Sequence, residues 1–318
     1  MDNNLIVPIA ADKPEWSVAV PYMFDIHPLG NLMLFESIRG LDLQAFDCIY
    51  VTILEKHDER YGLRAMLNEQ FALSGLAGKL KVVVLERPTG SQPETVAKTI
   101  ESEGIEGSVL IKDADNYFEC SPTRENTIGI FPLDALERVN PADKSYVALD
   151  DSMYVTNIIE KKIIGRYFCA GAYGFRSAGQ FMDYFEKLSE CRPLYLSHVI
   201  YSMLLDQISF RPVIVKNYID WGTRREWLEY CGGFRTLFVN WRLLENGRNE
   251  EAREKVNALY ETGRNRIVLV VENNLLQEQN IKQHISQSGI RFHHIIKGAF
   301  LHNMKLITAA DQLAKIDC

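Results

Sequence analysis

Short apolar runs alternate with longer mixed stretches along the first half of the chain. The runs are LIVPIA at Leu5–Ala10, FDCIYVTIL at Phe46–Leu54, KVVVL at Lys81–Leu85 and SVLI at Ser108–Ile111. They are continuous rather than alternating, which is typical of strands that are buried on both faces. Buried strands separated by helical stretches predict an α/β fold, in which helices flank a mostly parallel, mixed sheet.

The connection after the third run carries the clearest helix signals. In TGSQPETVAKTIESEG, Ser91 is placed to cap a helix and Glu94 to complete a capping box. Pro93 falls in the first turn, where its missing N–H costs nothing, and Gly104 suits the left-handed end. We therefore expect a helix from about Gln92 to just before Gly104.

After about Gly129 the pattern loosens into shorter strands, among them KSYVAL and AGAYGF. A Cys-Gly-Gly at 231–233 is the candidate domain boundary. Beyond it, RTLFVNW at Arg235–Trp241, RIVLVV at Arg266–Val271 and RFHHII at Arg291–Ile296 alternate with helices that end near Gly263 and Gly289. The expected domains are residues 1–233 and a smaller α/β domain at 234–318.

Composition narrows the class of protein. The 318 residues suggest about two domains, and 47% hydrophobic with 24% charged residues is typical of a folded globular protein. The net charge of −7 comes without a basic block, so nucleic acid is not an expected partner. Six dispersed cysteines form no C-x-x-C pair, which argues against zinc and a disulfide framework.

Location follows from the same reading. The N-terminus MDNNLIVPIAADKPEW has no basic segment, and its apolar run is too short for a signal peptide. No later run approaches the length of a membrane span, so we expect no membrane insertion. Together with the cysteine pattern this predicts a cytoplasmic protein.

Carboxylates mark the candidate chemistry. Asp113 and Asp115 directly follow the SVLI run, and ligands of open α/β sheets bind at the carboxyl ends of strands. The alternative is that both acids only form Asx-turns or cap the next segment. Asp220, in NYIDWGTRREW, is a second candidate ligand. One or two carboxylates with phosphate oxygens and water are a typical Mg²⁺ site, so acids from two distant segments are a sensible pair.

Five segments together resemble the sugar-phosphate nucleotidyltransferases, a family with a GT-A-like, Rossmann-like fold that makes nucleotide-activated sugars for bacterial surface (capsular) polysaccharides. The similarity spans about Leu5 to Tyr230. It is carried by these segments in order: LIVPIA, TGSQPETVAKTI, IKDADNYF, NIIEKKIIGRYFCAGAYGF and YIDWGTRREW. The resemblance implies attack of a sugar-1-phosphate, or a similar phosphate, on the α-phosphorus of a nucleoside triphosphate, with release of pyrophosphate.

The resemblance also assigns roles to residues. Asp115 and Asp220 would hold Mg²⁺, with Asp113 as a helper. Lys161 would neutralise the phosphate of the acceptor, although the EKK segment could instead be a solvated turn. The base-contacting segment is Gly90, Ser91 and Gln92, although Gln92 could equally lie in the solvated start of its helix. The implied partners are a nucleotide with a sugar phosphate, or a nucleotide-sugar; a homo-oligomer or a partner biosynthetic enzyme is left open.

The largest departure lies after the first strand. Active members have a glycine-rich basic loop and then a Pro-Lys pair, whereas this chain has AADKPEWSVAVPYMF. Lys13 supplies the one positive charge there, Pro14 removes a backbone donor, and Tyr22 follows Pro21 where lysine is expected. The sequence thus favours weak or lost turnover. A catalytically inactive nucleotide-binding regulator is the main alternative, and a GT-A glycosyltransferase that uses a nucleotide-sugar is the second.

The C-terminal segments look like a haloacid-dehalogenase (HAD) domain that has lost its chemistry. Asn240 and Arg242 stand where that family has its nucleophilic and acid–base aspartates. Asparagine cannot form an aspartyl-phosphate, and arginine cannot transfer the proton. The later acid pair is replaced by Thr308 and Ala309, with only Asp311 nearby. We expect a degenerate domain without phosphatase activity.

Overall fold

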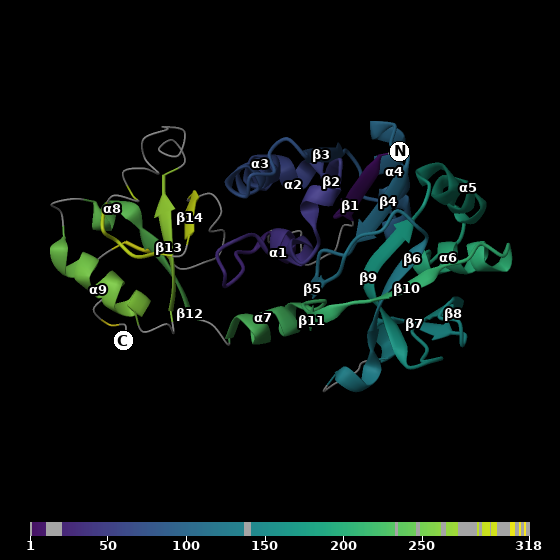
Figure 1. Ribbon diagram of the computed structural model, residues 1–318. Helices are drawn as coiled ribbons and strands as arrows, with labels where there is room; N and C mark the ends of the chain where they lie inside the picture. The colour runs from purple at the N-terminus through teal and green to yellow at the C-terminus, as the bar shows by residue number, and fades with distance from the viewer. Residues whose placement is uncertain are drawn as a thin grey trace. The chain divides into compact units, whose positions relative to one another are not determined.

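The structure is a computed structural model. It describes residues 2–10, 21–136, 141–232, 235–245, 249–261, 265–272, 285, 288–292, 294–297, 306–308, 312 and 315. Two compact units are formed, the first from Met1–Val18 and Leu34–Asp220, the second from Ala19–Met33 and Trp221–Cys318 (Figure 1). Within the described residues, no helix has the length and apolar character needed to cross a bilayer.

A mixed sheet forms the centre of the first unit. Its main path, in spatial order, is β10 (Arg211–Ile214), β6 (Thr127–Pro132), β9 (Tyr167–Phe175), β4 (Ser108–Lys112), β1 (Asn3–Pro8), β2 (Cys48–Leu54) and β3 (Leu80–Leu85). The strands from β4 to β3 are parallel, whereas β9 runs antiparallel to both β4 and β6. The predicted α/β class with a mostly parallel, mixed sheet is confirmed.

Two smaller pairings complete this unit. β7 (Ser145–Leu149) pairs with β9 and with β8 (Val155–Glu160), so that an antiparallel hairpin extends the sheet. β5 (Asn116–Glu119) pairs with β11 (Lys216–Asp220) as a separate two-stranded ribbon. The helices are α1 (Met33–Arg39), α2 (Glu55–Tyr61), α3 (Leu63–Leu73), α4 (Gln92–Glu103), α5 (Ala178–Leu188) and α6 (Leu196–Leu205).

Helix α4 begins and ends as its sequence predicts. The Ser91 hydroxyl accepts a hydrogen bond from the Glu94 N–H at 3.3 Å, Pro93 lies in the first turn, and Gly104 closes the helix at φ +59°. The capping box differs in one detail, because the Glu94 carboxylate accepts from the N–H of Gly90 at 2.7 Å. The polar cap nevertheless satisfies orphan donors at the helix start.

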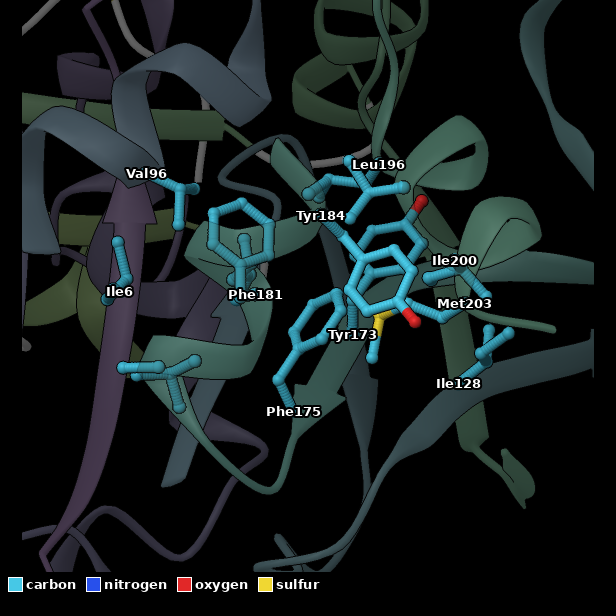
Figure 2. Close-up of a cluster of buried hydrophobic side chains, with 14 of the residues drawn as sticks. Ile6, Val96, Ile128, Tyr173, Phe175, Phe181, Tyr184, Leu196, Ile200 and Met203 are labelled. Carbon is cyan, nitrogen blue, oxygen red and sulfur yellow. The ribbon is translucent and has the colours of Figure 1, made fainter. Parts of the chain in front are cut away.

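The core of this unit lies between the sheet and helices α4, α5 and α6. Figure 2 shows Phe181 and Tyr184 of α5 and Ile200 and Met203 of α6 in one cluster with side chains of β9, among them Phe175. On β1, Ile6 joins this cluster, while its neighbours Leu5 and Val7 point to the other face and are equally buried. Burial on both faces explains why the central strands read as continuous apolar runs.

Two strands differ from their predicted extent. β1 begins and ends two residues earlier than the LIVPIA run, because Asn3 and Asn4 pair with their neighbours and are buried. AGAYGF is not a short strand but the end of the nine-residue β9. Gly174 within it is required by close packing, since an added Cβ would lie 2.3 Å from the Thr127 hydroxyl.

The second unit contains a parallel sheet. Its order is β14 (His294–Lys297), β13 (Asn265–Val271), β12 (Arg235–Asn240) and β15 (Leu306–Ile307). The accompanying helices are α7 (Arg224–Gly232), α8 (Trp241–Leu244) and α9 (Glu250–Glu261). Strand–helix alternation after the Cys-Gly-Gly is therefore confirmed for the described residues. Most of the helix expected before Gly289 lies outside them.

Candidate functional site

The order of the strands marks where a ligand of this sheet would bind. β1, β2 and β3 are added in one direction, and the chain then returns to place β4 on the other side of β1. The carboxyl ends of β1 and β4 therefore form the switch point, the usual ligand crevice of an open α/β sheet. The loop before α4 reaches this edge as well, because the Thr89 N–H donates to the Ala10 carbonyl at 3.2 Å.

The β5–β11 ribbon brings the two predicted metal-binding segments together. Asp220 is the partner of Asn116 in the register of this antiparallel pair. Asp115 immediately precedes Asn116, so the backbones that carry Asp115 and Asp220 are neighbours although they are distant in sequence. This local pairing explains how acids from two segments reach one edge of the sheet.

Asp113 lies at the same edge and contacts the start of α4. Its carboxylate accepts a hydrogen bond from Gln92 Nε2 at 2.5 Å. Its own N–H donates to the carbonyl of Gly171 in β9 at 2.9 Å. Burial raises the pKa of Asp113, and the negative charge of Asp115 adds to that rise. The structure thus brings together Gln92 and Asp113, while Ser91 caps the helix and Gly90 binds Glu94.

Gly171 of β9 allows the turn at Asp113 to pack closely against this strand. Its φ is +91°, and an added Cβ would lie 2.6 Å from Asp113 Oδ2 and 2.7 Å from Asn116 Nδ2. Real Cβ atoms do not approach other atoms this closely, so any side chain would displace the acid. Glycine is therefore needed here both for the backbone conformation and for contact.

Lys112 ends β4 with a fully buried side chain, although a lysine next to a strand end is normally solvated. Its ammonium donates to the carbonyl of Asp113 at 2.6 Å and to the side chain of Asn116 at 2.6 Å. It also lies over the Phe118 ring, 4.4 Å from the centroid. Burial lowers the pKa of Lys112, and the nearby Asp113 and Asp115 oppose that shift. The buried ammonium therefore holds both ends of the segment at 113–116, which we call the acidic turn.

Lys161 lies at the end of β8 and is exposed. Its φ of +58° puts it in the left-handed region, and its ammonium donates to the Tyr195 hydroxyl at 3.2 Å. This hydrogen bond is the main reason why the pKa of Lys161 is raised. The preceding Glu160 accepts from Ser197 Oγ at 2.8 Å and also from Ser145 Oγ. Within the described part of the chain, no hydrogen bond or ion pair joins Lys161 to the three aspartates.

A cation that sequence reasoning missed lies between the segments. Lys144, directly before β7, forms an ion pair with the carboxylate of Asp220. Its ammonium also donates to the Tyr218 hydroxyl at 2.9 Å. The positive charge of Lys144 lowers the pKa of Asp113 as well, against the larger effect of burial. Lys144 is therefore the basic side chain that reaches the acids from the β7–β8 hairpin.

Asp113, Asp115 and Asp220 offer carboxylate oxygens, the donors that Mg²⁺ prefers. In the described ranges, no group of three or more His, Cys, Asp or Glu side chains could enclose a metal ion. Mg²⁺, however, is commonly held by one or two carboxylates and completed by phosphate oxygens and water. Asp115 makes no hydrogen bond or salt bridge to another described residue, and Asp220 is its neighbour across the ribbon. Hard oxygen donors of this number fit Mg²⁺ with a bound phosphate ligand.

Lys13 is the predicted basic residue of the segment after β1. Lys13 lies outside the described residues, as does the rest of the segment at 11–20. Tyr22, at the position where the resemblance leads one to expect lysine, belongs to the second unit. It is buried there, and its hydroxyl donates to the carbonyl of Gly222 at 3.0 Å.

Asp113, Asp115 and Asp220 together form what we call the acidic edge of the sheet. The strand order and this edge are those of a nucleotidyltransferase-like α/β fold. The nucleoside-diphosphate-sugar pyrophosphorylase from Vibrio cholerae RC9 is similar over 71% of this chain and 98% of its own, with a TM-score of 0.57 and 15% identity. The inositol-1-phosphate CTP transferase from T. maritima covers 71% of this chain and 91% of its own, with a TM-score of 0.53 and 14% identity.

A third solved structure of this kind is a complex with a nucleotide-sugar. The UDP-glucose pyrophosphorylase complexed with UDP-glucose covers 73% of this chain and 97% of its own, with a TM-score of 0.54 and 12% identity. No protein-family model matches the sequence, and no curated protein matches it. At these identities the likeness establishes the fold, which is that of sugar-phosphate nucleotidyltransferases.

Three of the site's residues were not found from the sequence, and each had a signal. Lys112 stands between an apolar run and an acid. This position is typical of a solvated lysine at the end of a strand, and only the structure shows that the side chain is buried. Lys144 precedes a strand that pairs with the strand ending at Glu160, so correct pairing of KSYVAL with TNIIEK would have placed it beside Lys161. Gly171 lies in the predicted AGAYGF strand, and a glycine inside a strand can mark the close approach of another backbone.

Proposed function

We propose that this protein is a sugar-phosphate nucleotidyltransferase-like protein that binds a nucleotide and a phosphate-bearing partner at the carboxyl edge of β1 and β4. The observation that carries the proposal is the register of the β5–β11 ribbon, which sets Asp220 opposite Asn116 and so beside Asp115. Together with the bond between Gln92 and Asp113, it gathers four predicted site residues at one edge.

In the proposed reaction an oxygen of the acceptor phosphate bonds to the α-phosphorus of the triphosphate. The bond from that phosphorus to its bridging oxygen breaks, and pyrophosphate leaves with the electron pair. Mg²⁺ bound by Asp115 and Asp220 would supply positive charge to the phosphate oxygens. Gly90, Ser91 and Gln92 bind and orient the base, and Lys161 holds the acceptor phosphate. Catalysis of this kind depends on positioning and charge neutralisation rather than on a protein nucleophile.

A specific observation favours binding with little turnover. Tyr22 occupies the position of the expected lysine and is buried, with its hydroxyl bonded to Gly222, so it supplies no charge to a triphosphate. Between Ala10 and Phe24 the chain has neither glycine nor arginine, and Lys13 is its one basic residue. The second candidate function is therefore a catalytically inactive homologue that binds nucleotide as a regulator or partner of a cytoplasmic biosynthetic enzyme, with surface polysaccharide synthesis as the proposed pathway.

For the C-terminal part we propose a degenerate HAD-like domain at 234–318, after a nucleotidyltransferase-like domain at 1–233. The parallel order β14-β13-β12-β15, with Asn240 ending β12, supports this proposal. Asn240 accepts from the Arg242 N–H at 2.9 Å, and the Arg242 guanidinium pairs with Glu272 at 2.8 Å. These side chains serve local structure, so we expect no Mg²⁺-dependent phosphate release from generic phosphate esters. Ala309 and Asp311 lie outside the described residues.

The activity test uses purified full-length protein with Mg²⁺, each nucleoside triphosphate in turn and a panel of sugar-1-phosphates. Pyrophosphate release and the mass of a nucleotide-sugar product are measured together. Slow product formation that is lost in Asp115→Asn would support the enzyme, and nucleotide binding without product would support the inactive homologue. Neither binding nor product with any nucleotide would refute both.

A further inference from the structure

Lys144 is held in an unusual place for a surface lysine. Its side chain is 17% exposed and its ammonium contacts the Asp220 carboxylate, whose side chain is 27% exposed. Two rings flank the ammonium, with centroids 5.4 Å away for Tyr218 and 5.7 Å away for Phe168. A lysine fixed by a carboxylate, a hydroxyl and two aromatic faces has a defined position, unlike a mobile surface lysine.

Lys144 is also the direct neighbour of Lys161. The N–H of Lys161 donates to the carbonyl of Lys144 at 2.8 Å, and the next residues along the hairpin, Ser145 and Glu160, are register partners. The two ammonium groups have different partners, since Lys144 contacts a carboxylate and Lys161 a phenol hydroxyl at 3.2 Å. The end of the hairpin therefore carries two neighbouring lysines, and the ammonium of Lys144 is the one that contacts Asp220.

The ammonium of Lys144 and a metal ion would compete for the carboxylate of Asp220. Mg²⁺ lies about 2.1 Å from its carboxylate oxygens, and an ammonium on the same carboxylate would be repelled by the divalent charge. The ammonium could be stabilised again by the nearest anion, which in a loaded site is a phosphate group. Lysine is suited to such a change of partner because its charge sits on a flexible stem with rotatable donors.

We propose that Lys144 neutralises Asp220 in the metal-free site and, when a divalent ion binds, turns to the ligand's phosphate, which it then holds together with Lys161. This inference rests on the proposed function and deepens it, because it adds a second phosphate-binding lysine. It also makes binding cooperative, because the metal ion and the phosphate strengthen each other's binding. Lys144 opposes the metal alone and favours the metal with phosphate.

The test measures two affinities in the full-length protein. Mn²⁺ serves as the spectroscopic probe for the metal site, and its binding alone is followed by electron paramagnetic resonance. Inorganic pyrophosphate is then titrated at saturating Mn²⁺ by calorimetry. In Lys144→Met we expect Mn²⁺ alone to bind about tenfold more tightly, as for release of one half-buried ion pair, and pyrophosphate to bind about tenfold more weakly.

Matched variants separate the parts of the proposal. Lys161→Met should weaken pyrophosphate binding but leave the affinity for Mn²⁺ alone unchanged, because Lys161 does not contact Asp220. Lys144→Arg keeps the charge and should bind Mn²⁺ alone as the wild type does. Tyr218→Phe removes one partner of the ammonium and should tighten Mn²⁺ binding by a smaller factor, which provides a second route if Lys144→Met folds poorly.

The outcomes distinguish this inference from the proposed function. If the wild type binds Mn²⁺ through Asp220 but Lys144→Met binds it no more tightly, the exchange of partners is wrong and the metal site stands. If pyrophosphate binding is unchanged in Lys144→Met, the phosphate role of Lys144 is wrong. If neither protein binds Mn²⁺, both the inference and the proposed metal site fail.

Discussion

Gly171 offers a direct test of how the acidic turn is positioned. In Gly171→Ala the new Cβ would lie 2.6 Å from Asp113 Oδ2 and 3.0 Å from Asp113 Cβ, so the turn has to move away from β9. The backbone also has φ +91°, which a non-glycine residue adopts at a cost of about 1–3 kcal/mol. We expect destabilisation by strain together with displacement of the Asp113 carboxylate.

Two other glycines provide controls that separate these effects. Gly104 has φ +59° but nothing within 4 Å of an added Cβ, so Gly104→Ala carries strain without a clash. Gly78 has neither a positive φ nor a neighbour within 4 Å, so Gly78→Ala should be close to neutral. A loss of 1 kcal/mol lowers Tm by about 2–4 °C in a domain of this size. The order of Tm should be Gly78→Ala, then Gly104→Ala, then Gly171→Ala as the lowest.

The same three variants are compared for Mn²⁺ and nucleotide binding. Only Gly171→Ala should lose affinity, because only it shifts the turn that carries Asp113 and Asp115. If Gly171→Ala unfolds no earlier than Gly104→Ala and binds as well, then the turn does not depend on contact with Gly171. The inference that the acidic turn is positioned by its packing against β9 would then be wrong.

Three further changes test other parts of the structure. Lys112→Met leaves buried acceptors without a donor and should cost about 3–5 kcal/mol in urea unfolding. Lys98→Met, at a side chain that is 41% exposed and pairs with Glu94, should cost under about 1 kcal/mol. Ser91→Ala removes the cap of α4 and should cost about 1 kcal/mol in the same assay. Burial raises the pKa of Asp25 despite the charge of Arg224, so the folded state holds the proton of this carboxyl more tightly than the unfolded state does. The stability of the wild type should therefore fall relative to that of Asp25→Asn as pH rises through the raised pKa. A difference in urea midpoint that stays constant with pH would contradict this.

The parts of the fold that could be predicted from sequence are those in which local pattern and tertiary burial agree. Continuous apolar runs predicted the central strands, and Ser91 with Gly104 predicted both ends of α4. β9 was predicted only as the short strand AGAYGF, and the pattern did not show that its glycines allow neighbouring chains to approach closely. Glycine in a strand has two opposite explanations, and the sequence alone does not separate them.

The residues of the candidate site also fall into those that the sequence indicates and those that it does not. Asp113, Asp115 and Asp220 could be proposed because two acidic segments occur in the order that the resemblance to a known family leads one to expect. Lys112 and Lys144 could not, since their importance depends on burial and on pairing between distant segments. A lysine in a sequence is usually solvated, and only the β7–β8 register and the β5–β11 ribbon bring Lys144 to Asp220.

Calorimetric titration of the full-length protein with nucleotides, with and without Mg²⁺, tests the central claim most directly. The account predicts Mg²⁺-dependent binding that is lost in Asp115→Asn and Asp220→Asn. It should persist in the control Asp134→Asn, whose acid is exposed and pairs only with Arg166 at 3.2 Å among the described contacts. Binding that survives loss of both Asp115 and Asp220, or no binding of any nucleotide, would contradict the account.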